Sequence, residues 1–266
     1  MGTPQLAAEL SSSAPLTCKL GHRVQLLPDE EAILLDLQST TRVVPRNREV
    51  VTEGEKYDSL LVVIEGVLIR YRILRDGRRQ IVNIILPGDF TGAHGCIFES
   101  ALFSIRTLTQ AVVGVVPLSR LGALVDSHPR LAAKLLWSFS GEGAIYAERL
   151  IAVGRRSALE RVAHFLLELL VRLQMVGLAD ERSYRIPLTQ ELIADALGLS
   201  IPHVNRVFRQ LRSEDLVVIE DQRVVVKDIR ALSTLAEFEP AYLSRFSFEG
   251  FMAPSEPSRA VAPQKI

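Results

Sequence analysis

The chain has 266 residues, 48% of them apolar, which is enough to fill the cores of two domains. Lysine plus arginine and aspartate plus glutamate number 31 each, so any attraction to nucleic acid must be local rather than a property of the whole chain. The longest helical apolar stretch, residues 162–173, is interrupted by charges, and the N-terminus has no signal-peptide pattern, so we expect a cytoplasmic protein without membrane contact.

Between residues 41 and 117, short β-branched runs alternate with glycine turns, a pattern that predicts an all-β barrel or sandwich. The clearest turn is Asp76-Gly77, a pair that favours a two-residue hairpin. The expected strands are residues 41–45, 49–53, 60–64, 67–74, 80–86 and 111–116. We expect this β-roll to occupy residues 26–128, after an N-terminal extension at 1–25.

Helices follow the strands, a short one at 118–127 and a long one that Pro129 opens and that continues to 153. One face of the long helix keeps the 4-3-4-3 spacing of a two-stranded coiled coil, which predicts a homodimer. The residues of this seam are Ala132, Leu136, Phe139, Gly143, Tyr146, Leu150 and Val153. The alternative, that the seam packs on the β domain, stays open, although an adjacent face with Leu131, Leu135 and Ile145 is available for that contact.

Gly154 is expected to end the dimerisation helix, assigned to 129–154, and residues 154–156 to form a hinge. Ser157 and Glu160 have capping-box spacing and start another helix that runs to about residue 176. A polar connector follows at 177–185. The C-terminal extension, 231–266, opens with a possible helix, but its last residues are rich in proline, serine and alanine and are expected to be disordered.

Residues 188–212, LTQELIADALGLSIPHVNRVFRQLR, have the pattern of a helix-turn-helix. Thr189 is a plausible N-cap of the first helix, Gly198 suits a left-handed residue in the turn, and Ser200 caps the second helix. No acidic residue occurs from 199 to 212, which suits a helix that enters the DNA major groove. The outer face of this helix carries His203, Asn205, Arg206, Arg209 and Arg212.

Two β-branched runs, 216–219 and 223–227, predict a hairpin or wing beside the second helix, so a winged helix-turn-helix is expected over 155–230. Thr189, Gln190 and Arg212 are candidates for phosphate contacts, and Arg206 for a base edge. A different interpretation is that the motif is only a surface for protein contact. An enzyme has little support, because the chain has no phosphate loop, His-x-x-x-His motif or nucleophile elbow.

The order of these parts resembles the CRP/FNR superfamily of bacterial transcription regulators. The resemblance covers about residues 26–227 and rests on 188–212 and on 54–92, GEKYDSLLVVIEGVLIRYRILRDGRRQIVNIILPGDFTG. It implies an α+β protein with a cyclic-nucleotide-binding-like jelly roll, a long dimerisation helix and a C-terminal winged helix-turn-helix. It further implies a dimer that binds a pseudo-palindromic site on double-stranded DNA and contacts RNA polymerase.

Two departures from the family concern its ligand and its operator. Ala93 stands where nucleotide-binding members place the ribose carboxylate, and Leu102 and Phe103 stand at the phosphate pair, so cyclic AMP is disfavoured. Weak candidates for a ligand pocket are Gly92, His94 and Arg106, the last only after a shift of register. In the recognition helix Ile201, Pro202 and His203 occupy the region of an acidic base-reading residue, which predicts a different half-site.

Other cofactors find weak support. Two cysteines, Cys18 and Cys96, are too few for a disulfide framework, and Cys18 alone in the N-terminal part cannot hold an iron–sulfur cluster. Haem ligation by His94 or His22 is possible, but single loop histidines are more often surface residues. Cys96 is more probable as an inert packing residue than as a redox thiol. The signal that the β-roll senses is not identified by the sequence.

Overall fold

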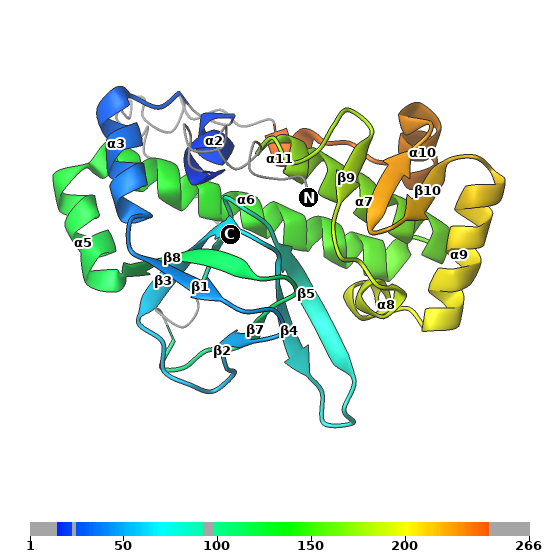
Figure 1. The fold of residues 1–266 in the computed structure, drawn as a ribbon, viewed down its shortest axis with the longest axis horizontal. Helices are drawn as coiled ribbons and strands as arrows, with labels where there is room; N and C mark the ends of the chain where they lie inside the picture. The colour runs from blue at the N-terminus through cyan, green and yellow to red at the C-terminus, as the bar shows by residue number, and fades with distance from the viewer. Residues whose placement is uncertain (1–14, 23–24, 93–97, 245–266) are drawn as a thin grey trace, which may run out of the picture.

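The computed structural model describes residues 15–22, 25–92 and 98–244. Its first half is a β-roll of two four-stranded antiparallel sheets, ordered β1-β8-β3-β6 and β2-β7-β4-β5, which lies to the left and below the long helix α6 in Figure 1. The strands are β1 Thr41–Val44, β2 Glu49–Val51, β3 Ser59–Glu65, β4 Leu68–Ile73, β5 Arg79–Ile85, β6 Phe90–Thr91, β7 Ser104–Thr107 and β8 Ala111–Pro117. All six expected strands are present, whereas β6 and β7 are additional.

The space between the two sheets is filled by alternate residues of the strands. The buried residues of this interior include Val51, Leu61, Leu68, Ile85, Ile105 and Val113. A glycine is required where the chain turns from β3 to β4, because a Cβ on Gly66 would lie 2.5 Å from the carbonyl oxygen of Gln110. Gly77 has φ +84° in the β4–β5 turn, as the Asp76-Gly77 pair predicts.

Four helices pack on one side of the roll: α2 Pro15–Gly21, α3 Pro28–Leu37, α5 Leu118–Ser127 and α6 Pro129–Arg155. Their shared core includes Leu16, Leu34, Leu60, Phe90, Leu131 and Leu135. Lys134 of α6 is fully buried, where it forms an ion pair with Glu30 of α3 and donates to the carbonyl oxygen of Gln25 at 2.7 Å. The two N-terminal helices were not expected from the sequence, which suggested only an extension before residue 26.

The expected seam of α6 coincides only in part with its exposed face. The side chain of Phe139 packs on the β-roll, with its ring centroid 5.0 Å from that of Phe90, and the hydroxyl of Tyr146 accepts a hydrogen bond from Arg70. The exposed stripe keeps three residues of that seam, Leu136, Gly143 and Leu150, and adds Ser140 and Ala147. The helix also passes through Gly154 and ends at Arg155, so the predicted end at Gly154 was wrong by one residue.

The second half follows a capping box in which Ser157 and Glu160 bond each other's backbone, as predicted. Its elements are α7 Ala158–Gln174, β9 Ser183–Arg185, α8 Gln190–Leu197, α9 Ile201–Ser213, β10 Val217–Glu220, β11 Arg223–Val226, α10 Ile229–Ala236 and α11 Ala241–Ser244. The expected hairpin is β10–β11, and β9, within the segment predicted to be a connector, adds a third strand in the order β10-β11-β9.

The two halves share one hydrophobic core. Buried residues on the outer face of the β4–β5 sheet, among them Ile69 and Ile84, join the core of helices α7, α8 and α9. Buried Arg172 of α7 reinforces this contact by donating to the carbonyl oxygen of Ile84 and to Asp89 Oδ2, each at 2.7 Å. The second half is therefore held in a defined orientation against the β-roll. No helix in the described part of the chain is long and apolar enough to cross a membrane.

Candidate nucleic-acid interface

Helix α8 and the turn after it have the geometry that the sequence predicts. Thr189 is the N-cap, and its side-chain oxygen accepts from the backbone N–H of Leu192 at 3.1 Å. Gly198 ends the helix in the left-handed conformation, at φ +63°. The chain therefore turns within three residues into α9, which lies at the right edge of the molecule in Figure 1.

Helix α9 buries one face and exposes the other. Val204, Val207 and Leu211 are buried against α7 and α8. The five residues expected to face DNA are all exposed: His203, Asn205, Arg206, Arg209 and Arg212. Ser200 stands at the N-cap position, but its side chain makes no capping hydrogen bond, so the expectation that it caps the helix was correct for its place and wrong for its hydroxyl.

The outer face of α9 is positively charged and unneutralised. Among the described residues, none of Arg206, Arg209 and Arg212 forms an ion pair. The acidic groups of neighbouring α8 are held from the other side, because Arg79 of β5 contacts Asp195 at 2.7 Å and Glu191 at 3.4 Å. These ion pairs keep negative charge on α8 from cancelling the field of α9.

The wing is fixed to α9 at its base. The backbone N–H of Leu216 donates to the carbonyl oxygen of Leu211 at 2.9 Å, directly after the helix. At the tip of the hairpin Asp221 and Gln222 both have positive φ, +47° and +62°, which matches a two-residue turn of the kind that suits hairpins. Helices α8 and α9 and the wing β10–β11 therefore form one winged helix-turn-helix module.

Among the described residues, the cavity in the interior of the β-roll beside Arg70 is small. The cavity lined by Arg70, Gly92, Leu102 and Phe103 has a volume of ≈ 10 Å³, about the space of one water molecule. Arg70 fills much of this region, since its guanidinium donates to Thr91 Oγ1 at 3.0 Å and also contacts α6 through Tyr146. Arg70 is therefore bound to groups of the protein itself in this structure.

The three candidates for a ligand pocket, Gly92, His94 and Arg106, differ in where they lie. Arg106 lies on the opposite face of β7 from buried Ile105, and its Nε donates to Glu49 at 2.7 Å. It therefore points away from the interior and does not supply the missing phosphate ligand. Gly92 is buried, with φ +91°. His94, Ala93 and Cys96 lie outside the described residues.

The cofactor candidates in the N-terminal part are dispersed. Cys18 is half-buried on α2, and His22 is exposed at the end of that helix. Among the described residues no three histidine, cysteine or acidic side chains gather as a metal site.

Comparisons with known proteins identify both halves. Residues 160–235 match the model of the Crp-like helix-turn-helix domain, and residues 41–128 match that of the cyclic nucleotide-binding domain. The transcriptional activatory protein AadR of Rhodopseudomonas palustris is 34% identical over 189 residues, which are 70% of this chain and 76% of that protein. The chain belongs to the CRP/FNR family of transcription regulators.

Two further members resemble this CRP/FNR protein over most of their length. The transcriptional activator protein anr of Pseudomonas aeruginosa is 27% identical over 239 residues, 88% of this chain and 93% of the other. The structure of FixK2 from Bradyrhizobium japonicum superposes with a TM-score of 0.66 at 28% identity, and the match covers 74% of this chain and 96% of that one. The fold and the order of the two halves are therefore those of the family.

Sequence reasoning did not find the residues that connect the halves. Arg79 follows the β4–β5 turn and contacts α8, and Arg161 of α7 donates to the carbonyl oxygen of Val153 of α6 at 3.0 Å. The chain offers one signal for Arg79, a basic pair directly after the Asp76-Gly77 turn. Nothing local indicates its partners, which lie 112 and 116 residues further along.

Proposed function

We propose that this CRP/FNR regulator acts as a homodimer that reads a pseudo-palindromic duplex through α9. The observation that carries the proposal is the set of arginines that α9 exposes without a protein partner among the described residues: Arg206, Arg209 and Arg212. An unpaired guanidinium fork fits a guanine edge or a phosphate. A cytoplasmic location and a contact with RNA polymerase belong to the same proposal, and family membership supports both.

Each side chain has a proposed role. Arg206 lies opposite the buried face of α9 and is the candidate for a base edge, with His203 and Asn205 as neighbours on the groove-facing side. Arg209 and Arg212 would contact phosphates. Thr189, Gln190 and Ser200 stand at the N-terminal ends of α8 and α9, where hydroxyl, amide and backbone N–H groups suit the DNA backbone.

The dimer interface of the proposal lies on α6. Leu136 and Leu150 are 62% and 75% exposed, on one stripe with the small residues Ser140, Gly143 and Ala147, which permit close approach of a second helix. Val153 is exposed beside this stripe, whereas Phe139 and Tyr146 stand at its edge against the β-roll. Two α9 helices in such a dimer would meet successive major grooves, ~34–36 Å apart.

Selection of bound sequences from random duplexes tests the proposal, followed by mobility shift in rising salt. We expect two inverted half-sites and an affinity that falls steeply with salt. Leu150→Arg should give monomers in sedimentation and lose binding to the paired site. The control is Val125→Arg on α5, which charges an apolar side chain that is 57% exposed and belongs to another helix. A wild-type protein that stays monomeric at micromolar concentration with DNA present, or that selects no sequence, would contradict the proposal.

A further inference from the structure

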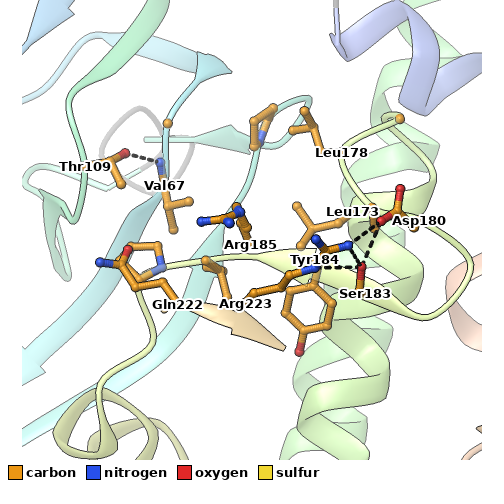
Figure 2. A pocket seen from close by; sticks show the side chains of 16 residues that line it. Val67, Thr109, Leu173, Leu178, Asp180, Ser183, Tyr184, Arg185, Gln222 and Arg223 are labelled. Atoms are coloured by element: carbon orange, nitrogen blue, oxygen red, sulfur yellow. Dashed lines mark hydrogen bonds and ion pairs between the residues drawn. The ribbon is translucent and has the colours of Figure 1, made fainter. Parts of the chain in front are cut away.

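A cavity lies between the β-roll and the DNA-binding half, outside the interior of the roll. Its volume is ≈ 530 Å³, against ≈ 10 Å³ for the cavity at Arg70. The first value is within the range of small-molecule sites, which often lie at domain boundaries. Gly66, Val67, Pro87 and Thr109 line the cavity from the roll, and Leu173 and residues 177–180, 183–187 and 222–223 line it from the other side. Figure 2 shows these two sets of side chains facing each other.

The walls combine apolar surface with positive charge. The apolar lining comes from both halves and includes Val67, Pro87, Leu173, Leu178, Ile186 and Pro187. Among the charged lining residues, Arg223 is neutralised by Asp180 at 3.0 Å and also donates to Ser183 Oγ at 2.7 Å. Arg185 has one hydrogen bond, a long one of 3.5 Å to the carbonyl oxygen of Asp221, and forms no ion pair within the described residues. The lining therefore carries one uncompensated positive charge.

The register of the sheet places a second cation beside Arg185. Arg185 of β9 and Arg223 of β11 are direct antiparallel partners, so both side chains start from the same side of adjacent strands. Like charges in this position repel each other unless an anion lies between or beside them. Asp180 supplies that anion for Arg223 alone. Arg185 is exposed and lines the cavity, and in the view of Figure 2 its guanidinium appears between Val67 and Tyr184.

We propose that this interdomain cavity binds a small organic carboxylate with an apolar body. The carboxylate would accept hydrogen bonds from Arg185, and the apolar body would cover Val67 and Leu173. Both halves contribute walls, so such a ligand binds best when they are docked as described here and shifts the population toward that arrangement. A change in DNA affinity on binding follows only if the function proposed above is correct, whereas binding itself does not depend on it.

Calorimetry on the full chain tests the site with octanoate and 4-phenylbutyrate as probes and octanamide as the neutral match of the first. We expect at least one acid to bind with a dissociation constant of about 1 mM or tighter and octanamide to bind about tenfold more weakly. Arg185→Gln should weaken the acid about tenfold. Arg182→Gln removes an exposed arginine of the same segment that does not line the cavity, and should change the constant less than twofold.

Three outcomes would overturn the proposal. Neither acid binds at concentrations up to about 5 mM, octanamide binds as tightly as octanoate, or the two arginine variants bind the acid equally well. Circular dichroism shows whether the variants are folded, and both change exposed side chains, so they are expected to be. Mobility shift with and without octanoate is a separate measurement. A protein that binds the acid but no DNA leaves the site intact and contradicts the proposed function.

Discussion

Arg172 of α7 and the arginines of α9 differ in burial and in ion pairing. Arg172 of α7 is 5% exposed and is matched by Asp89 at 2.7 Å and Glu168 at 3.0 Å, because a charge removed from water must be compensated. Arg206, Arg209 and Arg212 of α9 are exposed and have no ion pair among the described residues. The first arrangement holds two halves of the chain together, and the second leaves charge available for a partner outside it.

Removing the matched arginine should have the largest effect on stability. Arg172→Ala leaves Asp89 and Glu168 buried with only Lys19 and Arg149 as counter-charges, and is expected to lower the free energy of unfolding by about 3–5 kcal/mol. Although burial opposes its ionisation, the charges of Lys19 and Arg172 lower the pKa of Asp89 to about 2, so it is ionised at neutral pH. Urea denaturation measures the change. Arg182→Ala, at an exposed arginine, should change stability by less than about 0.5 kcal/mol, and equal losses in the two variants would contradict this interpretation.

The second largest effect is expected in mild acid, where His164 should lower the stability of the fold. This histidine is buried beside Phe238 and Tyr242. Burial, and then the charge of Arg156, lower its pKa to about 4, against a usual value of 6.5. The unfolded chain therefore binds a proton between pH 6.5 and 4 that the folded chain does not, so stability is complete above pH 6.5 and falls as the pH approaches 4. From pH 6.5 to pH 5 the loss should be about 2 kcal/mol.

His164→Phe should remove most of that loss, because phenylalanine keeps the aromatic contacts without a titrating group. Denaturation at pH 7 and pH 5 measures the difference for each protein. His203→Gln, at an exposed histidine of α9, is the matched control and should leave the acid loss unchanged. An acid loss that is the same in wild type and His164→Phe would assign it to other groups.

Local patterns in the sequence predicted what local contacts decide. Thr189 and Gly198 mark the two ends of α8, because an N-cap and a left-handed turn depend on only a few neighbouring residues. The buried stripe of α9 follows from the helical spacing of its apolar residues. The pattern of α6 could not show which apolar face is outermost, because Phe139 finds its partner, Phe90, in a distant strand.

Long-range pairs explain the other differences between expectation and structure. Arg172 and Asp89 are 83 residues apart, and Arg106 is directed outward by Glu49, 57 residues before it. Neither pair produces a periodic pattern in the sequence, because each joins single residues of separate elements. The exposed arginines of α9 could be predicted because they need no partner within the chain.

The arginines of α9 are expected to differ among themselves, since Arg206 is proposed to contact a base and Arg212 a phosphate. Arg206→Ala should cost on the order of 1–3 kcal/mol in binding to the selected site and relax the preference at one base pair, because the side chain is expected to pair with a base edge. Titrations against the selected duplex and against duplexes changed at single positions measure both effects. If the ratio of specific to non-specific affinity stays as in wild type, Arg206 does not read a base.

The smallest effect is expected at Arg212, in the last turn of α9. Arg212→Ala should weaken binding to all duplexes by a similar factor and reduce the slope of log affinity against log salt by about 0.9, the value for one lost phosphate contact. Arg230→Ala, at an exposed arginine of α10, is the matched control and should leave the slope unchanged, because it removes the same charge away from α9. A phosphate contact sets the position of the helix without distinguishing bases, so the preferred sequence should not change. If Arg212→Ala altered which base is preferred, α9 would have to enter the groove further along its length than its exposed face suggests.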